Sequence, residues 1–250
     1  MLRLSLRLIA IVAALLVCLP LHYLWRLLHL RSIWPQVFLA CVARFAGMRV
    51  RIEGMPLKSH VLYASNHVSW LDILALGGAT PAVFVARHDV EEWPMVGWLA
   101  GINDTIYVAR HARSEVQEQA DQLRRALAAG RALALFAEGT TNGGPELLPF
   151  RASLFASLYP PLDGVTVQPV AIDYGPIAEE IAWVGAESTG ANAKRVMSRK
   201  GSFVVTLRFL DPIDPAESGN RKLLANQARS AVGAALGKAD SAFGAGGDPL

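Results

Sequence analysis

The chain has 250 residues, of which 52% are hydrophobic and only 18% are charged, and its mean hydropathy is +0.31. This composition excludes a disordered chain, a collagen-like repeat and a disulfide scaffold, and a net charge of +3 is too small to indicate nucleic-acid binding. Seven arginines precede the first acidic residue, Glu53, whereas the rest of the chain carries 17 basic and 21 acidic residues. A basic, apolar N-terminus before a mildly acidic domain favours anionic lipid over nucleic acid as a partner.

The N-terminal segment is apolar enough to contact a membrane. Its uncharged stretch, residues 8–25, would form a helix roughly 27 Å long, near the thickness of a bilayer core, and the arginines on both sides give no clear orientation. A second apolar stretch, residues 33–48, is interrupted by a proline, a glutamine and an arginine. We therefore predict that residues 1–48 form a helical membrane anchor, as one span, a shallow hairpin or a helix lying in the interface. The alternative is that they are the first buried helices of a soluble domain.

Beyond residue 48 the sequence alternates between β-rich and helical segments. Helices are expected over residues 114–129, where Ser114 and Gln117 match a capping box, and over residues 220–236. This alternation predicts an α/β domain over residues 49–236 with a central sheet, followed by a flexible tail of residues 237–250. The expected strands are residues 50–53, 61–65, 82–86, 105–109, 132–136, 165–172 and 203–209.

A histidine and an aspartate follow the second expected strand. His67 and Asp72 are five residues apart, so on a regular helix their side chains would diverge by roughly 140°. However, Ser69 followed three residues later by Asp72 predicts a helix N-terminus with Ser69 as the N-cap. His67 would then lie in the preceding loop, and Asp72 could point back and orient it as a general base. The alternative is an ordinary loop histidine and a capping aspartate.

A second candidate site leaves the end of the strand 132–136. Gly139 permits unusual backbone angles, the following amides can face an anion, and Glu138 could bind a polar head group or an acceptor hydroxyl. The alternative is a simple turn.

Arg110 and Arg151 also follow apolar segments, and both could hold phosphate or carboxylate unless they are surface arginines. Pro169 interrupts the strand 165–172 and predicts a sheet edge or a strand end.

Other sequence signatures are missing. The sequence contains no G-x-S-x-G, G-x-x-x-x-G-K-[ST], G-x-G-x-x-G or H-E-x-x-H segment, which weakens the case for common serine hydrolases, P-loop NTPases, dinucleotide enzymes and zinc proteases. Cys18 and Cys41 have no metal-binding spacing and are expected to be buried, apolar thiols.

The ordered motifs resemble those of the bacterial lysophosphatidic-acid acyltransferase family, the 1-acyl-sn-glycerol-3-phosphate acyltransferases and their relatives. Four segments between residues 66 and 172 carry the resemblance, in the order of the family's N-H-x4-D, arginine-ending, F-P-E-G-T and V-P-V-x-I blocks. These segments are Asn66-His67-Val68-Ser69-Trp70-Leu71-Asp72, Ile106-Tyr107-Val108-Ala109-Arg110, Phe136-Ala137-Glu138-Gly139-Thr140 and Val167-Gln168-Pro169-Val170-Ala171-Ile172.

The resemblance implies a glycerolipid-acyltransferase-like mixed sheet flanked by helices and an O-acyltransferase that needs no metal or other cofactor. The donor would be a thioester, acyl-CoA or acyl-ACP (acyl carrier protein), and the acceptor a lyso-lipid at the membrane, on the cytoplasmic face of the inner membrane. The implied site residues are His67 and Asp72 for catalysis, and Arg110, Glu138, Gly139, Thr140 and Arg151 for substrate binding.

The third segment departs from the family pattern. The family usually continues with arginine and serine, where this chain has Thr141 and Asn142, and Ala137 replaces the usual proline. Residues 138–155 look closer to the lyso-ornithine-lipid acyltransferase branch, although some lysophospholipid-remodelling relatives share a similar run. The resemblance thus implies 1-acyl-sn-glycerol 3-phosphate as acceptor, giving phosphatidic acid, with lyso-ornithine lipid as the alternative.

The sequence leaves two other functional classes open. One is a thioesterase or lipid hydrolase that uses Ser65 or Ser69 as a nucleophile with His67, although the missing G-x-S-x-G elbow disfavours it. The other is a non-enzymatic lipid-binding protein in which the His67–Asp72 pair is structural.

Overall fold

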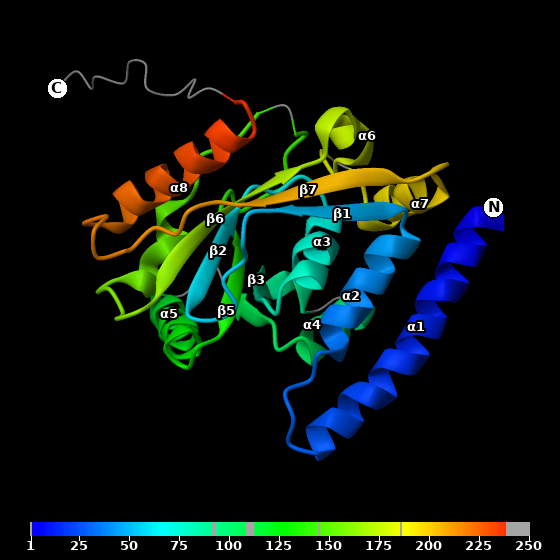
Figure 1. Ribbon diagram of the computed structural model, residues 1–250, viewed down its shortest axis with the longest axis horizontal. Coiled ribbons are helices and arrows are strands. Elements are labelled where there is room, and N and C mark those ends of the chain that lie inside the picture. The colour runs from blue at the N-terminus through cyan, green and yellow to red at the C-terminus, as the bar shows by residue number, and fades with distance from the viewer. Residues whose placement is uncertain (1, 92–93, 109–112, 145, 186, 239–250) are drawn as a thin grey trace.

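The computed structural model describes residues 2–91, 94–108, 113–144, 146–185 and 187–238. Within these residues the chain folds as an α/β structure around one seven-stranded sheet (Figure 1). The strands are β1 Met48–Glu53, β2 Val61–Ser65, β3 Val83–Arg87, β4 Ile106–Val108, β5 Ala132–Phe136, β6 Thr166–Asp173 and β7 Phe203–Phe209. The α-helices are α1 Leu2–Leu27, α2 Trp34–Phe45, α3 Leu71–Ala79, α4 Pro94–Ile102, α5 Arg113–Ala128, α6 Ala178–Ile181, α7 Thr189–Ser198 and α8 Arg221–Ala235. Short 3-10 helices are η1 His88–Val90, η2 Ala152–Leu158 and η3 Gly175–Ile177.

The sheet has the strand order β1-β7-β6-β2-β5-β3-β4. Its neighbours pair in parallel except β6 and β7, which are antiparallel. The predicted mixed sheet and all seven predicted strands are therefore confirmed, three of them to the residue. Because β2, β5 and β6 lie side by side and run in parallel, the loops that follow them meet at one edge of the sheet.

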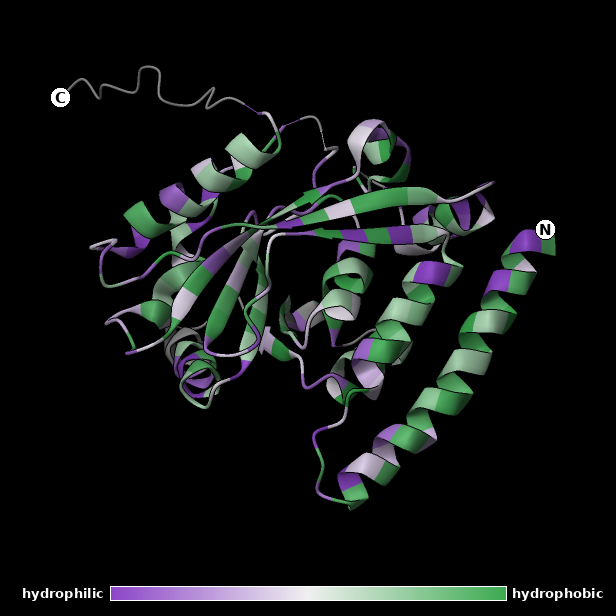
Figure 2. Cartoon of the chain, in the orientation of Figure 1, coloured by the Kyte–Doolittle hydropathy of each residue, from purple (hydrophilic) through white to green (hydrophobic). Residues whose placement is uncertain are grey.

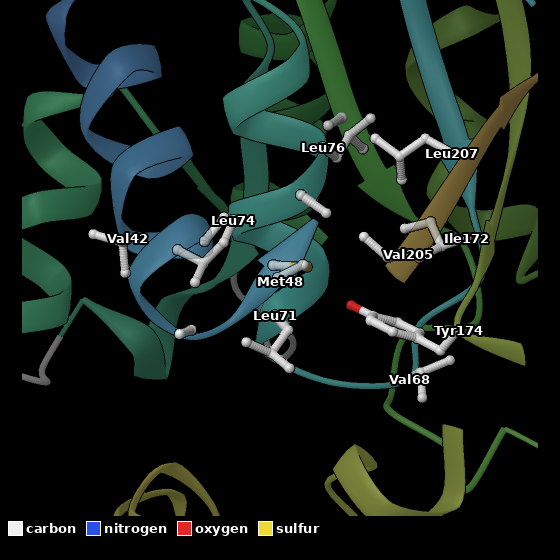
Figure 3. Packing of buried hydrophobic residues seen from close by; sticks show 14 of the residues in the cluster. Val42, Met48, Val68, Leu71, Leu74, Leu76, Ile172, Tyr174, Val205 and Leu207 are labelled. Atoms are coloured by element: carbon white, nitrogen blue, oxygen red, sulfur yellow. The ribbon is translucent and has the colours of Figure 1, made fainter. Parts of the chain in front are cut away.

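Helices cover both faces of the sheet, and the alternation of side chains along the strands explains why. On β2, Val61 and Tyr63 join a core formed with α2, α3 and α7, whereas Leu62 and Ala64 join a core formed with α5, η2 and α8. Successive strand residues point to opposite faces, and both faces of β2 are buried. Figure 3 shows part of the first core, where side chains of α3, β6 and β7 surround Met48.

Three local predictions were wrong. Ser69 is not the N-cap of α3, because Trp70 occupies that position and makes no side-chain capping bond. Helix α5 begins at Arg113, so Ser114 already lies inside it. Pro169 lies inside β6, which is central rather than at an edge. Its missing N–H causes no loss there, because regular pairing with β7 starts at Val170 and the Pro169 carbonyl accepts from Leu210, beyond the end of β7.

Helix α1 is long and apolar enough to cross a membrane by length and composition. It lies alongside α2 (Figure 1) and is hydrophobic along most of its length (Figure 2), and many of its large apolar side chains are exposed. The Arg7 side chain ties its N-terminal end to the domain by donating to the carbonyls of Met197 at 2.9 Å and Gly201 at 3.2 Å. The C-terminal end of a helix attracts cations, so this contact is favourable.

Helix α2, by contrast, is part of the domain core. Its Phe38, Val42 and Ala43 are buried in the same core as the sheet. It packs closely on α3 because α3 presents two glycines, and a Cβ atom added at Gly78 would lie 2.9 Å from the backbone of Ala40. The sequence analysis placed α2 in the anchor, residues 1–48. In the structure, α2 shares a core with the domain that follows residue 48.

We expect Gly78→Ala to reduce the free energy of unfolding by about 1–3 kcal/mol, because α2 must move away from α3 to admit the methyl group. Gly190→Ala in α7 is the matched control, since its Cβ meets no atom within 4 Å, and it should be neutral or stabilising by up to about 1 kcal/mol. Denaturant unfolding of both variants in detergent, followed by tryptophan fluorescence, measures the difference. Equal effects of the two substitutions would contradict this account of the packing.

Candidate active site

The loop after β2 is held against β6 by a buried asparagine. The Asn66 side chain donates to the Ile172 carbonyl at 3.0 Å and accepts from the Ile172 amide at 2.8 Å. It thereby continues the pairing of β2 with β6 past the last strand residue and fixes where His67 emerges. The sequence analysis included Asn66 in a motif but assigned it no role.

His67 and Asp72 are in direct contact, as the sequence analysis predicted. The His67 Nδ1 atom lies 2.8 Å from Asp72 Oδ2. Because an ionised carboxylate only accepts hydrogen bonds, Nδ1 carries the proton, and the lone pair of Nε2 is the ring's remaining proton acceptor. The ring stacks on Phe136 at a centroid distance of 3.9 Å, and 17% of the side chain is exposed. The ring is thus fixed in orientation and still reachable.

The Asp72 carboxylate is fully buried and accepts four hydrogen bonds. Besides His67, the Oδ2 atom accepts from the amides of Val68 at 2.7 Å and Ser69 at 3.0 Å, and Oδ1 accepts from the Tyr174 hydroxyl at 2.6 Å. Asp72 therefore orients the imidazole and also holds the turn that leads into α3. A buried charge satisfied in this way is stable, whereas the loss of one partner is costly.

Glu138, at the end of β5, braces the His67 loop from the other side. Only 1% of the residue is exposed. Its Oε1 accepts from the His67 amide at 3.2 Å, its Oε2 accepts from the Asn142 side chain, and the Asn142 amide donates to the His67 carbonyl at 2.9 Å. Burial raises the pKa of Glu138 to about 7, although the bonds from His67 and Asn142 oppose this shift. Both carboxyl oxygens thus already have partners within the protein.

The structure brings Arg151 to the Glu138 loop. Its Nε atom donates to the Glu138 carbonyl at 3.1 Å, and its side chain lies across Gly139, where a Cβ atom would come within 2.9 Å of Nε. Gly139 has φ +71°, a conformation that favours glycine. Thr140 is exposed beside it, whereas Arg110 lies outside the described residues.

The structure also bears on the serine-nucleophile alternative, on metal binding and on the position of the nearest large groove. Ser65 and Ser69 are both fully buried, so neither offers an accessible nucleophile beside His67. Among the residues that the structure describes, no three His, Cys, Asp or Glu side chains gather in a way that could hold a metal ion. A groove of about 480 Å³ runs along α2, and none of its lining residues belongs to the His67 or Glu138 loops.

Comparison with known proteins identifies the family of the chain. A family model described as Acyltransferase matches residues 48–173. The chain belongs to this acyltransferase family. The resemblance inferred from the four motifs is therefore confirmed, and the matched region contains both the His67 loop and the Glu138 loop.

Individual relatives carry two different names. A lyso-ornithine lipid O-acyltransferase of Brucella abortus is 34% identical over 257 residues, which cover 94% of each chain. A 1-acyl-sn-glycerol-3-phosphate acyltransferase of Neisseria gonorrhoeae is 30% identical and covers 76% of each chain. The crystal structure of the acyltransferase PlsC of Thermotoga maritima has a TM-score of 0.62 over 84% of this chain and 80% of that chain. At 20% identity this last likeness shows a shared fold.

We expect the Glu138 carboxyl to make stability depend on pH. Because its pKa rises from 4.5 to about 7 on folding, the folded protein binds a proton that the unfolded chain releases between these values, so stability falls as pH rises through this window. Glu138→Gln should flatten the decline between pH 5 and 8, even if the variant is less stable at every pH. Unfolding midpoints across this range measure the slopes, and parallel curves for the two proteins would refute the assignment.

Proposed function

We propose that this acyltransferase transfers a fatty acyl group from a thioester to the hydroxyl of lyso-ornithine lipid. The proposal rests on the contacts of Thr141 and Asn142, which stand where the family usually has arginine and serine. Both side chains bond to groups of the protein itself. The Thr141 hydroxyl donates to the Trp183 carbonyl at 2.7 Å. The Asn142 side chain donates to the Glu146 carbonyl at 3.0 Å and accepts from Gly144 at 2.7 Å, besides contacting Glu138. These side chains hold the loop together instead of presenting a cation to a phosphate.

An ornithine head group fits the groups that the loop does offer. It carries a carboxylate, which the guanidinium of Arg151 could hold, and no phosphate. The name of the Brucella relative, which aligns over nearly the whole chain, supports the same acceptor. 1-Acyl-sn-glycerol 3-phosphate is the second candidate, because Arg151 could equally hold a phosphate and the Neisseria relative is named for that acceptor.

The mechanism follows from the free Nε2 of His67. As the acceptor hydroxyl attacks the carbonyl carbon of the thioester, Nε2 takes its proton and a new C–O bond forms. The tetrahedral oxyanion then collapses, the C–S bond breaks, and the imidazolium returns the proton to the departing thiolate. Asp72 stabilises the imidazolium between these steps. No covalent acyl-enzyme forms, and the donor is acyl-CoA or acyl-ACP.

We further propose that α1 lies in the membrane interface, with the active site on the cytoplasmic side, where both thioester donors are made. The contact of Arg7 with α7 supports this placement, because a helix that left the domain to cross the bilayer could not keep both its ends beside the domain. The outward apolar face of α1 would then enter the lipid, while Arg3 and Arg26 sit near anionic head groups.

The acceptor is tested with the purified full-length protein, lyso-ornithine lipid and 1-acyl-sn-glycerol 3-phosphate of matched chain length, and either donor. We expect kcat/KM to be at least about tenfold higher for lyso-ornithine lipid, a difference of about 1.4 kcal/mol.

His67→Ala should reduce transfer by about 10²–10⁴-fold because it removes the general base. His88→Ala, which removes an exposed histidine paired with Glu91, should change little. A preference for the glycerol phosphate would overturn the acceptor, and an active His67→Ala variant would overturn the mechanism.

The position of α1 is tested by cysteine labelling in sealed vesicles. In a protein with Cys18→Ala and Cys41→Ala, single cysteines are introduced as Leu2→Cys and Leu30→Cys, at exposed positions near the two ends of α1. For a helix in the interface, a membrane-impermeant maleimide should label both cysteines from the cytoplasmic side. Labelling from opposite sides would instead show a span.

A further inference from the structure

A tyrosine hydroxyl contacts the side of Asp72 that His67 does not use. Tyr174 follows directly after β6, and its hydroxyl donates to Asp72 Oδ1 at 2.6 Å. Only 3% of the residue is exposed. Figure 3 shows the ring lodged in the core, with the hydroxyl directed toward Met48 and the first turn of α3. The residue lies one position beyond the region that the family model matches, and the four sequence motifs do not include it.

We propose that Tyr174 is a positioning residue for acyl transfer. Its hydroxyl fixes the orientation of the Asp72 carboxylate that supports His67 and shares the negative charge of that carboxylate. The proposal rests on the proposed role of His67 as the general base. Asp72 Oδ2 has three donors on its own loop, whereas Tyr174 is the donor to Oδ1 from another element. The tyrosine therefore fixes the rotation of the carboxylate about its axis and directs Oδ2 to the imidazole.

The hydroxyl is suited to act as a permanent donor. Burial raises the pKa of Tyr174 well above its ordinary value, and the adjacent Asp72 charge and the hydrogen bond raise it further. The phenol therefore stays protonated at neutral and mildly alkaline pH. By sharing the charge of Asp72, the hydroxyl limits how strongly the carboxylate stabilises the imidazolium, so His67 can release its proton to the leaving thiolate.

Among the residues that the structure describes, charged groups near the His67–Asp72 pair include Glu138 and Arg151, whose Nε donates to the Glu138 carbonyl. From the end of β5, Glu138 accepts from the His67 amide. Asp173, which precedes Tyr174, pairs with Arg208 of β7 at 2.8 Å. On α3 itself, Asp72 is the acidic residue of the first turn. These neighbours are unchanged when the hydroxyl of Tyr174 is removed, so a shift in the pH dependence of the pair can be assigned to that hydroxyl.

The test compares Tyr174→Phe with Tyr63→Phe. Tyr63 is also a buried tyrosine, but its hydroxyl donates to the Leu57 carbonyl and makes no bond to the site. In Tyr174→Phe we expect kcat to fall about 3- to 30-fold, as for the loss of one hydrogen bond to a charged group, while KM for the acceptor changes less than about twofold. The acid limb of the pH–rate profile should move to higher pH, because the carboxylate then binds the protonated imidazole more tightly. Tyr63→Phe should leave the limb in place.

Two further measurements keep the proposal falsifiable. In an Asp72→Asn background, Tyr174→Phe should have little additional effect on kcat, because the two residues act through one interaction. Titration of selectively labelled histidine, assigned with a His67→Gln sample, should show the same upward shift without any acceptor present, so a wrong acceptor does not affect this result. An unshifted titration in Tyr174→Phe, or independent losses in the double variant, would overturn the role of Tyr174 while leaving the proposed reaction standing.

Discussion

The ionised carboxylate of Asp72, buried and satisfied by four donors, joins three parts of the fold. It holds the loop after β2, lies in the first turn of α3 and contacts Tyr174 beyond β6. A buried charge is costly unless every lone pair finds a partner, so these elements can take up few other arrangements. The same bonds that stabilise the charge fix the imidazole of His67, which makes the local fold and the proposed chemistry inseparable at this point.

A second brace comes from the adjacent loop. Glu138 and Asn142 bind the backbone of His67 on both sides, through its amide and its carbonyl. Because β5 and β6 both neighbour β2 in the sheet, their loops reach the His67 loop from opposite sides. The site is therefore supported by the order of the strands rather than by one contiguous segment, and the loop that carries His67 is held by rigid elements on both sides, as precise chemistry requires.

The substitution of Thr141 and Asn142 changes what the second loop can do. In this chain both side chains serve the loop itself, so a cation for the acceptor has to come from elsewhere, and Arg151 lies across Gly139. A planar guanidinium binds a carboxylate as readily as a phosphate. In the proposed mechanism, one fold and one base serve acceptors with different head groups, and the loop determines which head group is held.

The sequence by itself determined the strands, the family and the meeting of His67 with Asp72, because these depend on apolar periodicity and on residues close together in the chain. It misplaced the cap at Ser69 and the role of Pro169, since both depend on what neighbouring elements supply. Only the tertiary structure showed that Glu138 faces inward and that Tyr174 reaches Asp72 across 102 positions. Such contacts follow from strand order and burial, which bring distant residues together and which no local pattern encodes.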